Sequence, residues 1–267
     1  PRPMLIDALF GTGLTRGLDE ALSRRLLDLA GQARVNVAID LPSGAATDDG
    51  RLLSPVPDCD LTVTFGTPKP SHFLQPAARA TGRLVIGDIG IEAEGPLHLI
   101  GRPSLPAPGP DDHKYRRGYV AIVAGEMPGA PTLTASAAAR AGAGYVRLIG
   151  KGIAGVPQAI VQGSGDLSLL DDQRIGCVAA GPGLGRCEEA RALLGRLLKA
   201  PAPLVLDADA LMLLDLGKLP PEAILTPHAG EFARLFSEIG GSKIEQARQA
   251  GGASRAVVLL KGAGTAV

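Results

Sequence analysis

Acidic residues and glycines directly follow two short apolar runs near the start of the chain. Asp7 begins the segment DALFGTGL after the run MLI, and Asp40 begins the segment DLPSG after the run VNVAI. A glycine loop between a strand and a helix can offer backbone N–H groups to a phosphate. An aspartate at a strand end can transfer a proton, or it can cap the next helix. Asp7 is poorly placed for a cap because it precedes its loop.

Two more polar segments follow the next apolar runs. The run LTVTF continues into GTPK and ends at Lys69, and the run RLVIG continues into DIGI from Asp88. Lys69 is either an ordinary surface lysine or a contact to a phosphate. Four polar segments on one sheet edge favour the second interpretation.

The second half of the chain repeats this arrangement with other side chains. Apolar runs precede the segments GPGLG (181–185), LDADA (206–210), LTPHAGE (225–231) and LKGAGT (260–265). A lysine followed by glycines and a threonine, as at Lys261, can bind phosphate through side chain and backbone. The order differs from that of a P-loop. The alternatives are a plain turn for GPGLG, a helix cap for Asp207 or Asp209, and a turn position for His228.

Parallel strands are the elements that would bring these segments together. Short runs rich in Val, Ile and Leu predict strands buried on both faces, at 4–6, 35–39, 61–65, 83–87, 119–124, 145–149, 177–180, 203–208, 223–226 and 256–260. Helical stretches at 18–33, 133–143 and 188–199 alternate with them. Strands and helices in alternation indicate an α/β fold with parallel sheets, whose carboxyl ends meet at one edge.

Composition limits the classes of function. A proline-rich stretch predicts a linker at 93–112, with domains at 1–92 and 113–267. The net charge of zero disfavours nucleic acid and anionic membranes as partners. No run approaches about 20 apolar residues. The three scattered cysteines argue against disulfides and zinc and favour a reducing cytoplasm. A homo-oligomer is compatible with all of this.

The first half resembles a known family. In order and spacing, DALFGTGL, AIDLPSG, DLTVTFGTPK and GDIGI are similar to the epimerase domain of the NAD(P)HX repair proteins, which act on hydrated NADH and NADPH. The resemblance implies that Asp7 and Ser43 are ligands of a potassium ion. It implies that Asp40 contacts the substrate and transfers protons. It also implies a loop that holds the substrate's phosphates, formed by Gly11, Thr12, Gly13, Leu14, Thr15, Arg16 and Gly17.

The second half resembles the dehydratase domain of the same repair proteins, which belongs to the ribokinase-like superfamily. The four segments above and the stretch 113–148 carry this resemblance. In that family a phosphoryl group from ADP or ATP is placed on the hydrate's hydroxyl, and elimination restores NADH or NADPH. The implied substrate contacts are Ala130, Gly183 and His228. The implied nucleotide-binding residues are Lys261, Gly262, Ala263, Gly264 and Thr265.

Together the two resemblances imply an α/β protein with two Rossmann-like or ribokinase-like three-layer domains and mostly parallel sheets. They imply a bifunctional epimerase and dehydratase that requires K⁺, a phosphoryl donor (ADP or ATP) and Mg²⁺. The family's earlier potassium-binding asparagine and its later GTGD segment are not in the printed chain, so we expect a chain incomplete at both ends. The alternatives are a ribokinase-like kinase for a vitamin or hydroxymethyl substrate, and a non-catalytic nucleotide-binding module.

Overall fold

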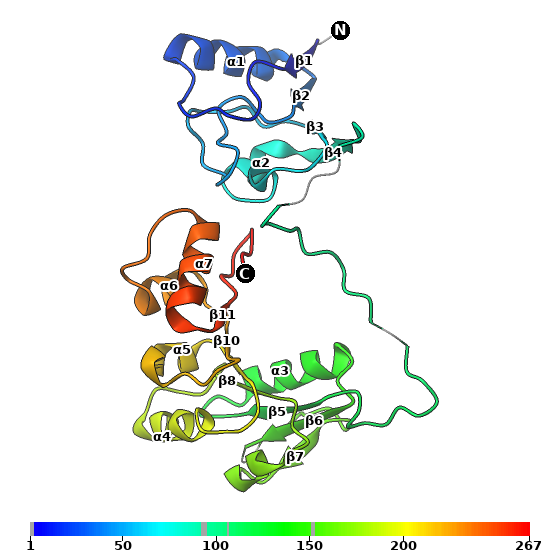
Figure 1. Cartoon of the computed structure of the whole chain (residues 1–267), viewed down its shortest axis with the longest axis vertical. Helices are drawn as coiled ribbons and strands as arrows, with labels where there is room; N and C mark the ends of the chain where they lie inside the picture. The colour runs from blue at the N-terminus through cyan, green and yellow to red at the C-terminus, as the bar shows by residue number, and fades with distance from the viewer. Residues whose placement is uncertain (1–2, 92–94, 106, 151–152) are drawn as a thin grey trace. The chain divides into compact units, whose positions relative to one another are not determined.

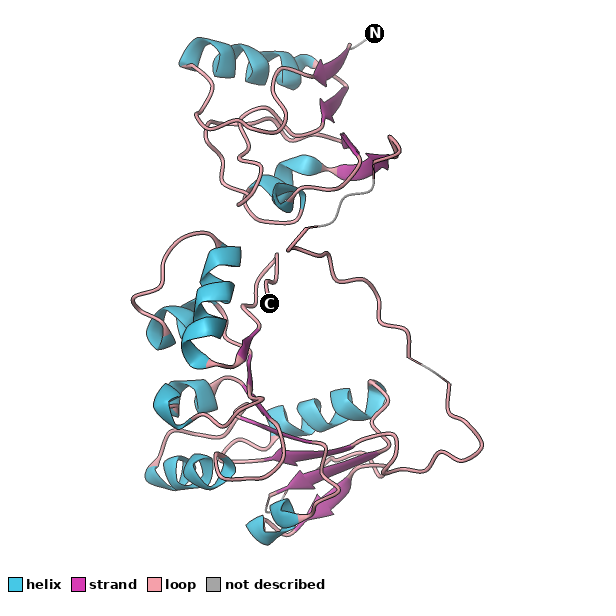
Figure 2. Cartoon of the chain, viewed as in Figure 1, coloured by secondary structure: helices cyan, strands magenta, loops and turns pink. Residues whose placement is uncertain are grey.

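The chain folds into two compact units, each built around its own sheet (Figures 1 and 2). A computed structural model describes residues 3–91, 95–105, 107–150 and 153–267. Unit 1 comprises Pro1–Pro103 and unit 2 comprises Ser104–Val267. The division falls within the predicted linker 93–112, of which residues 93, 94 and 106 lie outside the described residues.

Unit 1 contains a parallel four-stranded sheet in the order β1-β2-β3-β4. Its strands are β1 (Met4–Asp7), β2 (Val35–Ile39), β3 (Leu61–Phe65) and β4 (Arg83–Gly87). The helices described in this unit are α1 (Glu20–Gln32) and the short α2 (Ala77–Thr81). The Asp19 side chain caps α1 by accepting the Leu22 N–H at 2.8 Å, and the helix buries Leu26 and Ala30. Apolar side chains such as Met4 and Ile86 remain exposed on β1 and β4.

Unit 2 contains a parallel seven-stranded sheet in the order β11-β10-β9-β8-β5-β6-β7. Its strands are β5 (Tyr119–Val123), β6 (Tyr145–Ile149), β7 (Val161–Gly163), β8 (Cys177–Ala180), β9 (Leu204–Leu206), β10 (Ile224–Leu225) and β11 (Val257–Val258). Its helices are α3 (Gly129–Arg140), α4 (Glu188–Leu197), α5 (Asp209–Leu213), α6 (Ala229–Leu235) and α7 (Lys243–Ser254).

Helices cover both faces of the unit 2 sheet, as the alternation of side chains along β5 shows. Ala121 and Val123 belong to the apolar cluster that includes Leu194 of α4, whereas Ile122 belongs to the cluster that includes Ala135 of α3. Successive side chains of a strand point to opposite faces, so α3 and α4 lie on opposite sides of the sheet. Unit 2 therefore has the three layers that the sequence predicts.

The strand order fixes where polar loops gather. In unit 2 the chain runs outward from β5 through β6 to β7, and then from β8 through β9 and β10 to β11 on the other side. The neighbouring strands β5 and β8 therefore form the topological switch point, where open parallel sheets bind ligands beyond the carboxyl ends of their strands. GPGLG follows β8 and the Ala130 segment follows β5, so both predicted substrate loops lie at that point.

Two other sequence observations extend to the described residues. No helix among them is long and apolar enough to cross a membrane. Cys59, Cys177 and Cys187 are all free thiols.

Candidate functional site

In unit 1, Asp7 and Ser43 form a buried pair between the loops that follow β1 and β2. The Ser43 hydroxyl donates to Asp7 Oδ1 at 2.6 Å, and the Ser43 backbone N–H donates to Asp7 Oδ2 at 2.8 Å. Both residues are at most 2% exposed. The Phe10 carbonyl oxygen lies 3.3 Å from the Ser43 hydroxyl, so three kinds of oxygen meet here. Such an oxygen set suits a hard cation.

Asp40 lies at the carboxyl end of β2 with its carboxylate divided between two tasks. Oδ1 accepts the Lys69 ammonium at 2.6 Å and the Thr64 hydroxyl at 2.8 Å, while Oδ2 accepts the Thr12 backbone N–H at 3.2 Å. Burial by itself raises the pKa of Asp40. The hydrogen bonds from Lys69 and Thr64 outweigh burial, so the pKa of Asp40 lies below its usual value. Asp40 is therefore an ionised carboxylate, suited to accept a proton.

The predicted phosphate loop, residues 11–17, joins β1 to the start of α1 and is exposed at Thr12, Gly13, Thr15 and Arg16. A side chain at Gly11 would place its Cβ 2.8 Å from Asp40 Oδ2, so glycine is needed for this approach. In the described part of the chain, the backbone N–H groups of Leu14, Thr15 and Arg16 have no acceptor. Unpaired N–H groups in an exposed glycine loop are suited to bind an anion.

The structure joins Lys69 to Asp40, a contact that the sequence did not indicate. Three acceptors surround the Lys69 ammonium, which differs from the free phosphate contact considered from the sequence. His72 was missed altogether, although its imidazole lies 2.8 Å from the Asp40 carbonyl oxygen. Its position three residues after Lys69, in a turn that begins at Pro70, is the only sequence signal for it. Asp88 accepts the Gly90 N–H in a local turn.

In unit 2, the glycines of GPGLG are needed for contacts within the protein. Gly181, Gly183 and Gly185 all have positive φ angles, of 125°, 70° and 84°. A Cβ at Gly183 would collide with the Met127 carbonyl oxygen, and the Met127 N–H donates to the Gly183 carbonyl oxygen at 2.9 Å. The loops after β5 and β8 are thus joined by their backbones, which accounts for the glycines before any ligand is considered. A contact of Gly183 with substrate remains a prediction.

Neither Asp207 nor Asp209 caps the following helix, so the capping interpretation is wrong. The residue before α5 is Ala208, with a φ of 49° and no side-chain cap. Asp209 is 9% exposed and accepts the Gly185 N–H at 3.1 Å and Arg186 Nε at 2.8 Å. It therefore holds the GPGLG loop against the end of β9.

Lys261 joins the ends of three neighbouring strands. Its ammonium lies 2.6 Å from Asp207 Oδ1, after β9, and its backbone N–H donates at 2.8 Å to the Pro227 carbonyl oxygen, after β10. Lys261 itself follows β11. Residues 261–265 form a turn that an antiparallel bridge between Leu260 and Ala266 closes. The Lys261 side chain is 36% exposed, so the ammonium can also meet a ligand.

His228 caps helix α6. Its Nδ1 accepts the backbone N–H groups of Gly230 and Glu231 at 3.0 and 3.3 Å, and its own N–H donates to the Glu231 carboxylate at 2.9 Å. The turn interpretation of His228 thus describes a real role. The side chain is 61% exposed, which leaves Nε2 accessible to a substrate.

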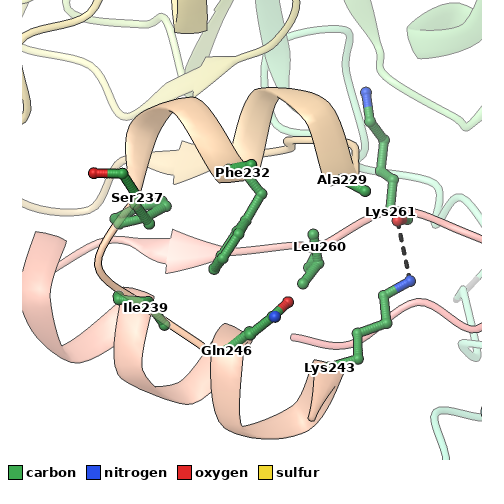
Figure 3. A pocket seen from close by; sticks show the side chains of 10 residues that line it. Ala229, Phe232, Ser237, Ile239, Lys243, Gln246, Leu260 and Lys261 are labelled. Atoms are coloured by element: carbon green, nitrogen blue, oxygen red, sulfur yellow. Dashed lines mark hydrogen bonds between the residues drawn. The ribbon is translucent and has the colours of Figure 1, made fainter. Parts of the chain in front are cut away.

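A hollow of about 360 Å³ lies beside Lys261, between α6 and α7 (Figure 3). Phe232, Phe236 and Leu260 form part of its apolar lining. Lys243 lies at one side and donates to the Lys261 carbonyl oxygen at 3.0 Å, the contact dashed in Figure 3. Burial lowers the pKa of Lys243. An apolar hollow with two lysines nearby suits a flat, uncharged ring that carries an anionic group.

Comparison with known proteins agrees with this architecture. A ribokinase-like superfamily protein of Enterococcus faecalis aligns with a TM-score of 0.52 at 22% identity, over 58% of this chain and 61% of its own. Unit 2 therefore has a ribokinase-like α/β fold. The family described as NAD(P)H-hydrate dehydratase matches residues 120–267, and the family described as YjeF-related protein N-terminus matches residues 1–71. The chain belongs to the NAD(P)H-hydrate dehydratase family.

Curated relatives match both units. Proteins described as bifunctional NAD(P)H-hydrate repair enzyme Nnr are 31% identical in Synechocystis sp., over 99% of this chain, and 35% identical in Mycobacterium tuberculosis, over 97%. The chain spans 57% of the length of each of these two relatives. A Bacillus subtilis ADP/ATP-dependent NAD(P)H-hydrate dehydratase, co-crystallised with ATP and Mg²⁺, is 28% identical over 60% of this chain and 64% of its own, with a TM-score of 0.51.

Proposed function

We propose that this protein repairs hydrated NADH and NADPH, with epimerisation of the R and S hydrates in unit 1 and ADP- or ATP-dependent dehydration of the S hydrate in unit 2. The observation that carries the proposal is the pairing of Lys261 with Asp207 and Pro227, which gathers three strand ends of a family-matched unit into one polar edge. The curated relatives that match both units support the combination of the two activities.

Epimerisation inverts a carbon that carries a hydroxyl beside a ring nitrogen. Ring opening or the loss and return of water would each require a proton acceptor and a proton donor near that carbon. Asp40, ionised and adjacent to the glycine loop, is the proposed acceptor. Gly11 to Gly17 would hold the substrate's phosphates through the loop's N–H groups. Asp7 and Ser43 would hold K⁺, whose charge would orient substrate oxygens.

Dehydration requires an adenine nucleotide next to the hydrate. Lys261 to Thr265 would hold the phosphates, and the hollow beside Phe232 would take the adenine ring. Ala130, Gly183 and His228 would contact the hydrate at the switch point of the sheet. Mg²⁺ bound with the nucleotide would neutralise phosphate charge. The free thiols, including the exposed Cys187, support the reducing cytoplasm as the place of action.

The direct test supplies the S hydrate of NADH, Mg²⁺ and either ADP or ATP, and follows the absorbance of reduced nicotinamide. We expect NADH to form only when nucleotide is present. A second assay supplies the R hydrate alone and separates the epimers by chromatography. A phosphorylated product without NADH would instead identify a kinase, and nucleotide binding without either product would identify a binding module.

Potassium dependence tests the Asp7 and Ser43 pair. Asp7→Asn preserves the shape of the side chain but removes its charge, so we expect K⁺ affinity to fall by at least about 10–100-fold, the range that loss of an outer partner already costs. The measurement is the rate of epimerisation as KCl replaces choline chloride at constant ionic strength. Asp49→Asn, at a carboxylate paired with Arg51, is the matched control. An unchanged potassium response in Asp7→Asn rules out this ion site.

Two substitutions at His228 separate its cap from its proposed substrate contact. His228→Ala should destabilise unit 2 by about 1 kcal/mol because α6 loses its cap, and His228→Asn should restore that stability. All three tyrosines lie in unit 2 and tryptophan is absent, so tyrosine fluorescence during denaturation reports this unit. We expect dehydration to remain slow in both variants. Full activity in His228→Asn would leave His228 only a structural role.

A further inference from the structure

The turn from Lys69 to His72, which follows β3, grips Asp40 at two places. Lys69 Nζ donates to Asp40 Oδ1 at 2.6 Å, to the Thr64 hydroxyl at 2.8 Å and to the Phe65 carbonyl oxygen at 3.2 Å. An ammonium has three donors, and all three are used here. The Lys69 side chain is 16% exposed. Lys69 therefore acts on Asp40 and has no donor left for a phosphate.

His72 holds the backbone of the same aspartate. Its Nδ1 accepts the Lys69 backbone N–H at 2.9 Å, and its Nε2 lies 2.8 Å from the Asp40 carbonyl oxygen. Since Nδ1 is an acceptor, the proton of the neutral ring is on Nε2, which donates to that carbonyl. His72 is 5% exposed, and burial lowers its pKa, which favours the neutral ring that this arrangement requires.

The backbone of Asp40 needs such a hold. Its φ angle is 68°, in the left-handed region that residues other than glycine rarely adopt. In this conformation the carboxylate reaches both loops, because Oδ1 meets Lys69 while Oδ2 meets the Thr12 N–H. Lys69 and His72 are the titratable side chains that contact Asp40 among the described residues, and the loop after β1 contributes only the Thr12 amide.

We propose that Lys69 and His72 are positioning residues for Asp40: Lys69 fixes the charge and direction of its carboxylate, and His72 fixes its backbone. This inference rests on the proposed epimerase function of unit 1. It assigns Lys69 a different role from a phosphate ligand. It also makes residues 69–72 part of the reaction site, although Lys69 is 29 residues from Asp40 in the sequence.

The charge of Lys69 has a measurable consequence for the pH profile. Asp40 accepts a proton only while ionised, so activity falls as the pH drops through its pKa. The Lys69 ammonium lowers that pKa. Removal of the ammonium raises the pKa, and the acidic limb of the profile therefore moves to higher pH. A neighbouring opposite charge typically lowers a carboxyl pKa by about 1–3 units.

The test compares Lys69→Met, Lys69→Arg and the control Arg79→Met, which removes a positive charge from an exposed ion pair with Asp58. For Lys69→Met we expect kcat for epimerisation to fall at least about tenfold, KM to change little, and the acidic limb to move up by about one unit or more. Lys69→Arg should return the limb towards its original position. An unmoved limb with a raised KM would overturn the proposal and make Lys69 a substrate ligand.

Two further measurements cover a variant that folds poorly and a protein that fails to epimerise. Thr64→Val removes one hydroxyl contact with Asp40 and should move the limb in the same direction by less. NMR titration of the Asp40 carboxyl carbon in the unaltered protein and in Lys69→Met needs no activity. A higher Asp40 pKa in Lys69→Met supports the inference even where the proposed activity is absent. An identical Asp40 pKa in the two proteins overturns it.

Discussion

Asp40→Asn is expected to slow epimerisation by about 10²–10⁴-fold, the contribution typical of a positioned acid or base. Asparagine is the informative replacement because it tolerates positive φ angles better than most residues, and Asp40 has a φ of 68°. Its amide oxygen can still accept from Lys69 and Thr64, so the site keeps its shape. The amide cannot take a proton at neutral pH. The rate of conversion of the R hydrate into the S hydrate measures the effect.

The same variant contains its own internal control. Dehydration of the S hydrate depends on unit 2, so Asp40→Asn should leave the ADP-dependent formation of NADH unchanged. Asp49→Asn, in the same unit but paired with the surface residue Arg51, should epimerise at the normal rate. If Asp40→Asn keeps more than about a third of the normal rate, another group accepts the proton and the contribution expected of a base is absent.

The strands could be predicted from the sequence because each is coded locally. The runs VNVAI, LTVTF and YVRLI coincide with β2, β3 and β6 at both ends. A buried parallel strand needs apolar side chains on both faces, and this requirement is visible in a few consecutive residues. β7 was missed because it has only three residues and lies at the sheet edge, with Val161 37% exposed.

Helices with little apolar surface were harder to predict. Helix α7 was missed because alanines and a serine, including Ala247 and Ala250, form its buried face, so its sequence lacks a marked apolar stripe. Helix α2 has only five residues. Helix α6 lies within the segment LTPHAGE and beyond, where the motif was recognised but the helix was not.

The site divides in the same way. Positions of polar residues at strand ends follow from the strands, and the structure brings the loop after β1 to the loop after β2 through Asp7 and Ser43. Their partners do not follow from local sequence. Lys69 reaches Asp40 across 29 residues, and Asp209 reaches Gly185 across 24. Such contacts depend on strand order and on loop backbones with positive φ angles, which side-chain types alone do not specify.

Gly183→Ala is expected to have the second large effect, on the stability and activity of unit 2. Gly183 has a φ of 70°, which costs an L residue about 1–2 kcal/mol, and an added Cβ would collide with the Met127 carbonyl oxygen. Overpacking of this kind costs about 1–3 kcal/mol more. We therefore expect tyrosine fluorescence to report a loss of about 2–4 kcal/mol in the unfolding free energy of unit 2. Epimerisation in unit 1 should be unaffected.

Gly195→Ala is the matched control for Gly183→Ala because it makes the same chemical change in a different backbone. Gly195 lies within helix α4, and a Cβ there meets no atom within 4 Å. Alanine in an exposed helix should stabilise unit 2 by about 0.5–1 kcal/mol. Dehydration should fall about 10²-fold in Gly183→Ala, since a displaced loop misaligns the substrate, and stay normal in Gly195→Ala. Equal stability of the two variants would mean that the loops after β5 and β8 are not joined at Met127.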